Sequence, residues 1–292
     1  MSWRRLAWLV ALGCGVVGGT GVVAPGSAAA DAPSASPPKK EPAPAPEQPS
    51  EEPSGAAGSK EAAESKDEAW CQKDLETLEH HVCAFVPAKD EASDTLVIFL
   101  HGVVKSESGW QYNQQLALVR AAKVNHFDLL APRGRRGIGP KDMEDWWTWP
   151  TRSSAQKTLE PELFDEWREA RKALEERRGK PYDKLIIVGF SNGAYYASSL
   201  VLRDAFEADG YGVFAGGGAN YLEATAKRIK HRPPVYVGWG LKDKSAKKDA
   251  AGFAKLLKRL GWKHRAKARP KVGHTMTDAG LKEAMSFLRG AK

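Results

Sequence analysis

The chain has 292 residues, 42% of them hydrophobic, which is enough for one large domain or two small ones with an ordinary apolar core. It carries 44 Lys and Arg against 36 Asp and Glu, a formal net charge of +8 at pH 7. An excess of positive charge favours anionic surfaces such as acidic polysaccharides or lipid headgroups. No stripe of basic residues interleaved with aromatic ones is present, which argues against a nucleic-acid partner.

Residues 1–30 have the composition of a secretory signal peptide. Arg4 and Arg5 precede an apolar run over residues 6–23, and three alanines at 28–30 suit a cleavage pocket. The run is short and broken by glycine, so it does not predict a membrane span in the mature protein. Two alternatives stay open: Cys14 ends a weak lipobox, which would make a lipoprotein, and the paired arginines resemble a twin-arginine signal. We expect a secreted, periplasmic or cell-surface protein.

Residues 31–66 are dominated by Pro, Ala, Glu, Ser and Lys and contain no aromatic residue. Such a segment cannot bury enough apolar surface to offset the entropy of ordering its backbone, so we expect a disordered linker. The globular domain is therefore expected over residues 67–292.

Cysteine usage fits an exported domain. If the signal peptide is removed, Cys71 and Cys83 remain, and an even pair in an oxidising compartment predicts one disulfide between the start of the domain and its first strand. Two unpaired buried thiols are the alternative. Neither cysteine lies in a CxxC pair or near a spaced pair of histidines, so no metal site is predicted.

Short apolar runs then alternate with amphipathic ones, which predicts the α/β class, with a mainly parallel sheet and helices on both faces. The expected strands are 81–87, 95–100, 126–132, 184–189, 211–215, 234–240 and 263–271. The expected helices are 161–178, 247–260 and 278–289, with Pro161 in the first turn of the first one, and a further helix directly after Ser191.

The segment Gly189-Phe190-Ser191-Asn192-Gly193 lies between an expected strand and an expected helix. A nucleophile elbow needs this context, because the serine occupies a strained turn and the flanking glycines let strand and helix approach closely. The alternative is a serine that only bonds its own turn. The surrounding elements favour Ser191 as a nucleophile.

A serine hydroxyl also needs an imidazole to take its proton and a carboxylate to orient that imidazole. Asp243 follows the expected strand 234–240, and His274 lies between the last strand and the last helix. The resulting order Ser, Asp, His is that of a nucleophile-elbow hydrolase. Asp249 and Asp278 are weaker candidates, because one falls inside a helix and the other suits an N-cap.

Acyl transfer further needs N–H donors for the developing oxyanion. The strand 95–100 ends in His101-Gly102, where a glycine lets the following backbone turn toward the site. The backbone N–H groups of Val103 and Asn192 are the candidate donors. His101 is expected to brace this loop rather than to act as a base.

Four motifs carry a family resemblance: Leu-His-Gly at 100–102, GFSNG at 189–193, GLKD at 240–243 and GHT at 273–275. In this order, across almost all of residues 81–292, they resemble an α/β-hydrolase, most closely its phospholipase/carboxylesterase and dienelactone-hydrolase-like branch. The resemblance implies Ser191, Asp243 and His274 as the catalytic triad and the same two oxyanion donors. After Gly102, however, Val-Val-Lys-Ser-Glu-Ser replaces the glycine-and-acid pattern usual in that branch.

A loop rich in arginine and tryptophan provides the substrate clue. Trp146, Trp147 and Trp149 follow an arginine cluster that begins at Arg133. The indoles could stack on a sugar or an aromatic acyl group, with the arginines meeting an anionic one, or they could cap the core under the loop.

These residues together predict an exported serine hydrolase that cleaves carboxylic esters, either small molecules or esters linked to a polysaccharide, without a metal or organic cofactor. A peptidase of the same fold is one alternative. A non-catalytic glycan-binding module at the cell surface is another.

Overall fold

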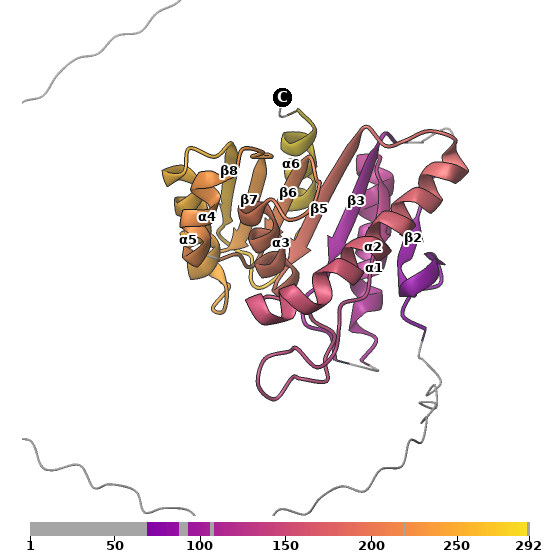
Figure 1. The fold of residues 1–292 in the computed structure, drawn as a ribbon, viewed down its shortest axis with the longest axis horizontal. Coiled ribbons are helices and arrows are strands. Elements are labelled where there is room, and N and C mark those ends of the chain that lie inside the picture. Colours follow the sequence, from indigo (N-terminus) through magenta and orange to yellow (C-terminus); the bar gives the residue numbers. More distant parts are fainter. Residues whose placement is uncertain (1–68, 88–92, 106–107, 219, 291–292) are drawn as a thin grey trace, which may run out of the picture. The chain divides into compact units, whose positions relative to one another are not determined.

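A computed structural model describes residues 69–87, 93–105, 108–218 and 220–290. The predicted signal peptide and linker lie outside these ranges. An eight-stranded sheet forms the centre of the fold, in the order β1-β2-β4-β3-β5-β6-β7-β8 (Figure 1). The strands from β4 to β8 in this order are parallel, while β2 pairs with β4 and β1 with β2 in antiparallel fashion. The predicted α/β class with a mainly parallel sheet is confirmed.

The strands β2 to β8 lie within one residue of the expected ranges or inside them. Their bounds are β1 Glu76–Thr77, β2 Cys83–Phe85, β3 Thr95–Leu100, β4 Asp128–Ala131, β5 Lys184–Phe190, β6 Gly210–Phe214, β7 Val235–Gly240 and β8 His264–Arg269. Only β1 was not expected, and it is a pair of exposed residues with no apolar pattern.

Helices cover both faces of the sheet. They are α1 Trp110–Asn125, α2 Ser153–Arg178, α3 Asn192–Arg203, α4 Glu223–Arg228, α5 Lys247–Arg259 and α6 Asp278–Gly290, with short 3-10 helices η1 Glu79–His81 and η3 Asn220–Leu222. Helices α1 and α6 pack on one face, and α2, α3 and α5 on the other (Figure 1).

Strand β3 shows how this arrangement uses the sequence. Leu96, Ile98 and Leu100 belong to one hydrophobic core, while Val97 and Phe99 belong to the core on the opposite face. Successive side chains point to opposite faces, so a strand covered on both sides must be apolar at every position. This explains why the expected strands are continuous hydrophobic runs.

The expected start of α2 was wrong. The helix begins at Ser153 rather than Pro161, so the proline lies inside the helix and not in its first turn. A proline inside a helix removes one backbone hydrogen bond. Buried polar contacts hold the turns before and at the proline: Gln156 donates to Ser199 Oγ at 3.0 Å, and Glu160 pairs with Arg203.

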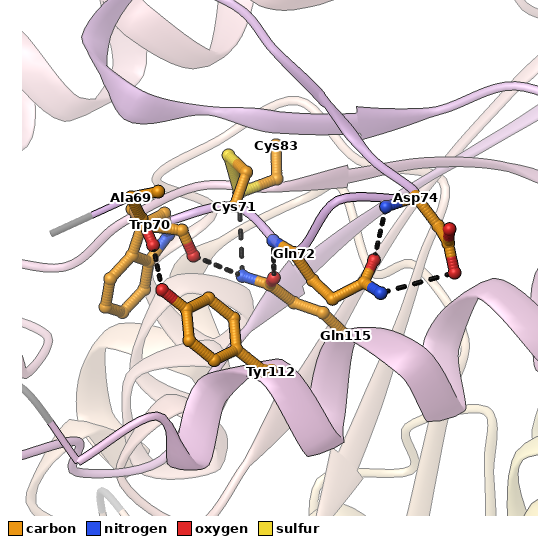
Figure 2. Close-up of a disulfide and its surroundings, with 8 residues drawn as sticks. All are labelled: Ala69, Trp70, Cys71, Gln72, Asp74, Cys83, Tyr112 and Gln115. Atoms are coloured by element: carbon orange, nitrogen blue, oxygen red, sulfur yellow. Dashed lines mark hydrogen bonds between the residues drawn. A yellow bond between two sulfur atoms is a disulfide. The ribbon is translucent and has the colours of Figure 1, made fainter.

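A disulfide joins Cys71 to Cys83 of β2, with the Cα atoms 5.3 Å apart (Figure 2). Beside it, the Gln115 side chain of α1 accepts from the Gln72 N–H at 2.7 Å and donates to the Trp70 carbonyl at 3.1 Å. The start of the domain is thus fastened to both the sheet and α1.

Among the described helices, none combines the length and the apolar character that crossing a bilayer requires.

Candidate active site

Ser191 occupies the sharp turn between β5 and α3. Its backbone has φ 52° and ψ −116°, a sparsely populated positive-φ conformation that costs a residue with a side chain on the order of 1–3 kcal/mol. Surrounding hydrogen bonds hold it: the Ser191 N–H donates to the Phe214 carbonyl at 2.9 Å, and its carbonyl accepts from the Ala194 N–H at 2.9 Å. The turn therefore presents the hydroxyl at the carboxyl edge of the sheet.

The two flanking glycines are required by close backbone approach. A Cβ at Gly189 would lie 2.2 Å from the Gly193 carbonyl oxygen, and a Cβ at Gly193 would lie 2.1 Å from the Leu100 carbonyl oxygen. Neither contact is sterically possible without moving backbone. The GxSxG spacing thus reflects the packing of α3 against β5 and β3.

The structure brings Ser191, His274 and Asp243 together. The Ser191 Oγ lies 2.9 Å from His274 Nε2, and His274 Nδ1 lies 2.8 Å from Asp243 Oδ2. The three residues follow β5, β8 and β7, parallel strands whose carboxyl ends meet at one edge of the sheet. With Nδ1–H donating to the carboxylate, Nε2 is free to accept the proton of the serine hydroxyl.

Asp243 is 1% exposed, and its second oxygen is fully engaged. Asp243 Oδ1 accepts from the Ser245 N–H at 2.9 Å, the Ser245 hydroxyl at 2.8 Å and the Ala246 N–H at 3.0 Å. Burial alone would raise the pKa of this carboxyl, but the hydrogen bonds from Ala246, His274 and Ser245 outweigh it and hold the pKa below its ordinary value. The carboxylate therefore stays ionised beside the imidazole.

Sequence reasoning missed Ser245. Its hydroxyl also lies 3.2 Å from His274 Nδ1, so it contacts both the carboxylate and the imidazole. An aspartate in a turn commonly accepts a hydrogen bond from the backbone N–H two residues later, which places residue 245 beside the Asp243 carboxylate. That signal could have found it.

The two candidate oxyanion donors flank Ser191. Asn192 is the first residue of α3, so its N–H has no partner four residues earlier in the helix. On the other side, a Cβ at Gly102 would lie 3.2 Å from the Ser191 Cβ, so the loop after β3 passes directly beside the serine. Val103 is the next residue of that loop, and the Gly193 N–H ties the loop to the turn by donating to the His101 carbonyl at 3.0 Å.

His101 braces this loop, as expected. It is 4% exposed, with Nδ1 2.5 Å from the Gly102 carbonyl and Nε2 accepting from the Gly134 N–H at 3.0 Å. Burial lowers the pKa of His101 to about 4, although the Gly102 contact acts in the opposite direction. The imidazole is therefore neutral and links the loop after β3 to the loop after β4.

Residues 81–291 match the model of a family described as phospholipase/carboxylesterase. The chain belongs to the phospholipase/carboxylesterase family. The match covers almost all of the described domain, including the turn at Ser191 and the loops that carry Asp243 and His274.

Relatives agree with this assignment. Acyl-protein thioesterase 1 of Debaryomyces hansenii is 26% identical over 219 residues, which cover 70% of this chain and 94% of that protein. Its namesake from Eremothecium gossypii is 24% identical over 220 residues, covering 70% and 91%. This phospholipase/carboxylesterase family member is therefore a hydrolase of the ester-cleaving kind.

Solved structures show the same fold. Esterase PE8 aligns with a TM-score of 0.52 and 23% identity, covering 70% of this chain and 96% of that one. The Bacillus cereus carboxylesterase aligns with a TM-score of 0.51 and 15% identity, covering 72% and 94%. At these identities the likeness establishes the α/β-hydrolase fold alone.

The three tryptophans of this family member occupy different environments. Trp149 is 1% exposed and stacks on Tyr196 of α3, with the ring centroids 6.0 Å apart. Its expected role as a substrate contact is corrected, since the core surrounds the ring. Trp147 is half-buried beneath the Arg133 guanidinium, which lies 4.2 Å from the ring centroid, and Trp146 is half-buried beside it.

Trp149 instead helps to build the site. Its backbone N–H donates to Asn192 Oδ1 at 2.7 Å, and its indole N–H donates to the His101 carbonyl at 2.9 Å. The tryptophan loop is thereby clamped onto the turn at Ser191. The sequence gives no signal for this role of the Asn192 side chain, because its partner lies 43 residues away.

An aromatic wall beside the imidazole was also missed. The Phe190 ring lies 5.2 Å from the His274 ring, and the 42% exposed Trp110 lies 6.3 Å from Phe190, centroid to centroid.

Possible metal ligands lie elsewhere in the fold: Glu79, His80 and Glu169 bring ligand atoms within 4.8 Å of one another at η1 and α2. All three are exposed, and none contacts the Ser191–His274–Asp243 chain.

Proposed function

We propose that the protein is an exported serine hydrolase that cleaves carboxylic esters through an acyl-enzyme on Ser191. One observation carries the proposal: a continuous hydrogen-bonded chain runs from the Ser191 hydroxyl through His274 to the buried Asp243. A serine held at positive φ at the end of a parallel strand has no structural need for such a chain. Membership of an ester-cleaving family supports the same reaction.

In the acylation step, the Ser191 Oγ attacks the ester carbonyl carbon while its proton passes to His274 Nε2. The carbonyl oxygen becomes an oxyanion, which the N–H groups of Val103 and Asn192 would stabilise. When the tetrahedral intermediate collapses, the bond to the leaving alcohol oxygen breaks and His274 returns the proton to that oxygen. The acyl group remains on the serine as an ester.

Water completes the cycle. His274 Nε2 takes one proton from a water molecule, whose oxygen attacks the acyl carbon. Collapse of the second intermediate releases the carboxylic acid and returns the proton to the Ser191 oxygen. Throughout, the Asp243 carboxylate accepts the Nδ1–H of His274, which keeps the imidazole in the required tautomer and stabilises its charged form.

The experiment is labelling with a fluorophosphonate probe, which reacts with activated serines. We expect the full chain to be labelled and Ser191→Ala to be unlabelled, with hydrolysis of 4-nitrophenyl acetate reduced on the order of 10³-fold or more. Ser154→Ala removes an exposed serine at the start of α2 and is the matched control. Undiminished labelling of Ser191→Ala would remove Ser191 as the nucleophile.

Thioesters are a second candidate substrate class, favoured by the two relatives named acyl-protein thioesterase 1. The same acylation applies, with a thiol as the leaving group in place of an alcohol. Matched oxygen and sulfur esters of one acyl chain, compared by kcat/KM, separate these classes. Activity confined to peptide amides would contradict both.

A further inference from the structure

The tryptophan loop, residues 146–149, contacts both segments that carry the candidate oxyanion donors. One donor is the N–H of Val103, in the loop after β3, and the other is the N–H of Asn192, the first residue of α3. Neither N–H has a hydrogen-bond acceptor among the residues that the structure describes. A developing oxyanion requires N–H groups that are not already bonded, and each of the two segments beside Ser191 supplies one.

The loop after β3 is held by the tryptophan loop on both sides of Val103. The indole N–H of Trp149 donates to the His101 carbonyl at 2.9 Å, two residues before Val103. Trp147 exchanges two backbone hydrogen bonds with Val104, the residue after Val103, at 2.8 and 3.0 Å. The position of the Val103 N–H is therefore set by contacts from residues 147 and 149.

The second donor is held by the same tryptophan. The backbone N–H of Trp149 donates to Asn192 Oδ1 at 2.7 Å, which fixes the Asn192 side chain at the start of α3. Trp149 thus bonds to both segments, to one with its indole and to the other with its backbone. Its ring is 1% exposed and packs against Tyr196 and Trp167, so it has little freedom to move.

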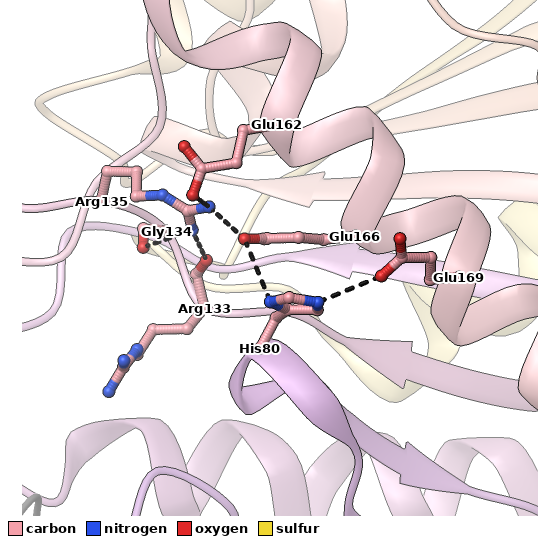
Figure 3. Close-up of polar contacts among 7 residues, drawn as sticks. All are labelled: His80, Arg133, Gly134, Arg135, Glu162, Glu166 and Glu169. Atoms are coloured by element: carbon pink, nitrogen blue, oxygen red, sulfur yellow. Dashed lines mark hydrogen bonds and ion pairs between the residues drawn. The ribbon is translucent and has the colours of Figure 1, made fainter.

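The tryptophan loop is itself anchored to α2. Arg135 and Thr148 exchange two backbone hydrogen bonds, at 2.7 and 2.9 Å. The Arg135 guanidinium in turn pairs with Glu162 and Glu166 of α2, at 3.3 and 2.5 Å (Figure 3). The Glu166 side chain is buried, so solvent screens its pair with Arg135 less than it would screen an exposed pair. The residues that hold the oxyanion donors are therefore fixed to a helix.

The distance between the two donors matters for catalysis. Each N–H must lie about 3 Å from the place that the oxyanion takes in the transition state. A displacement of about 1 Å can cost about 100-fold in rate. A residue that bonds to both donor segments fixes the distance between them.

We propose that Trp149 is a positioning residue, which sets the separation of the Val103 and Asn192 N–H groups through its indole and backbone N–H groups. The proposal rests on the proposed function and adds a residue that acts on the oxyanion only through these two segments. The hydrogen-bonded chain from Ser191 to Asp243 does not depend on it.

Trp149→Phe tests the proposal, because it removes the indole N–H and keeps an aromatic ring in the core. The His101 carbonyl still accepts from the Gly193 N–H at 3.0 Å, so it is not left without a donor. The probe is trifluoroacetophenone: the Ser191 oxygen adds to its carbonyl carbon, the serine proton passes to His274 Nε2, and the carbonyl oxygen becomes an oxyanion. We expect the inhibition constant to rise about tenfold or more, and kcat/KM for 4-nitrophenyl acetate to fall by a similar factor.

Trp167→Phe is the matched control. Trp167 is also 1% exposed, its ring centroid lies 5.8 Å from that of Trp149, and its indole N–H has no partner among the described residues. Both variants lose the same atoms from the same core, so a general loosening of the core affects both. Only Trp149→Phe is expected to weaken inhibition. Equal weakening in both variants, or a lower kcat/KM in Trp149→Phe with an unchanged inhibition constant, overturns the proposal.

Asn192→Ala is the second variant, and it replaces Trp149→Phe if that protein fails to fold. It removes the acceptor of the Trp149 backbone N–H and keeps the backbone N–H of residue 192. We expect the inhibition constant of trifluoroacetophenone to rise here too. An unchanged constant overturns the proposal, because Trp149 would then not fix the second donor.

Fluorophosphonate labelling of the unmodified protein separates this proposal from the proposed function. If the protein is labelled and hydrolyses esters, but Trp149→Phe behaves like Trp167→Phe, the role of Trp149 alone is overturned. If the unmodified protein is neither labelled nor active on any ester, the proposed function itself is overturned.

Discussion

Asp243 is the residue whose charge the surrounding structure most clearly maintains. Three donors hold its Oδ1 while its Oδ2 accepts from His274, and its pKa is lowered in spite of burial. Asp243→Asn removes the charge that stabilises the imidazolium and favours the wrong tautomer of His274. We expect kcat on 4-nitrophenyl acetate to fall on the order of 10³- to 10⁴-fold.

The control for this change is Asp249→Asn. Asp249 lies on α5 and accepts a hydrogen bond from the Tyr195 hydroxyl at 2.6 Å, without contacting His274. Its kcat should stay close to that of the unmodified protein. A similar loss in both variants would argue against a specific role for Asp243.

His101 predicts how stability depends on pH. Its folded pKa of about 4 lies below the ordinary value of 6.5, so between these values the unfolded chain binds the proton more readily than the folded one. The free energy of unfolding should therefore fall as the pH drops from about 6.5 toward 4, by about 3 kcal/mol from this residue. Urea unfolding at stepped pH measures it, and a His101→Gln variant should show a shallower dependence. An unchanged slope in that variant would contradict the assignment.

For individual residues, the sequence predicted that Ser191, Asp243 and His274 come together, because each of them follows the end of a predicted strand. Their catalytic roles stay predictions until the variants are measured. Trp149 was misassigned because the sequence of a loop does not show whether a tryptophan ring faces the solvent or the core. Its contact with Asn192 joins positions that no local spacing relates.

At the scale of elements, every strand except β1 was predicted, whereas α1 and α4 were not expected and the start of α2 was wrong. The buried face of α1 includes Gln111 and Gln115, whose polarity hides the helical apolar period. Gln115 is buried because it bonds to the segment that contains Trp70, which is a tertiary contact. The first turns of α2 were missed for a similar reason, since contacts to α3 hold them in place on the N-terminal side of Pro161.

The packing of α3 on β3 makes a sharp element-scale prediction at Gly193. In Gly193→Ala the new Cβ would meet the Leu100 backbone at 2.1 Å, so strand and helix must separate. We expect a loss of stability on the order of 2 kcal/mol or more, with loss of ester hydrolysis, because overpacking shifts backbone. Chemical denaturation and activity are measured together.

Gly252→Ala is the matched change. Gly252 lies within α5, and a Cβ there would meet nothing within 4 Å. Alanine is the better helix former, so stability should rise by roughly 0.5–1 kcal/mol. If Gly193→Ala were as harmless as this control, the close approach of α3 and β3 would be wrong.

For the molecule as a whole, the cysteine pair and the N-terminal signal make one coherent prediction about compartment. Cys71 and Cys83 are 12 residues apart, and a crosslink over a loop of this size stabilises a fold by about 3 kcal/mol in the chain-entropy account. Protein recovered after export should show no free thiol at these positions by alkylation and mass spectrometry, and reduction should lower its melting temperature. Two freely alkylated cysteines would contradict the disulfide.

Export itself is tested at the N-terminus of the mature protein. The alanines at 28–30 predict cleavage before Asp31, which would leave the 31–66 segment as a polar tether ahead of the hydrolase domain. The intact mass of protein secreted by a bacterial host should match a chain that begins at Asp31, whereas acylation at Cys14 would add lipid and place it on a membrane. A chain that keeps residues 1–30 and stays inside the cell would contradict export. It would also remove the reason to expect an oxidised cysteine pair, since reducing compartments keep thiols free.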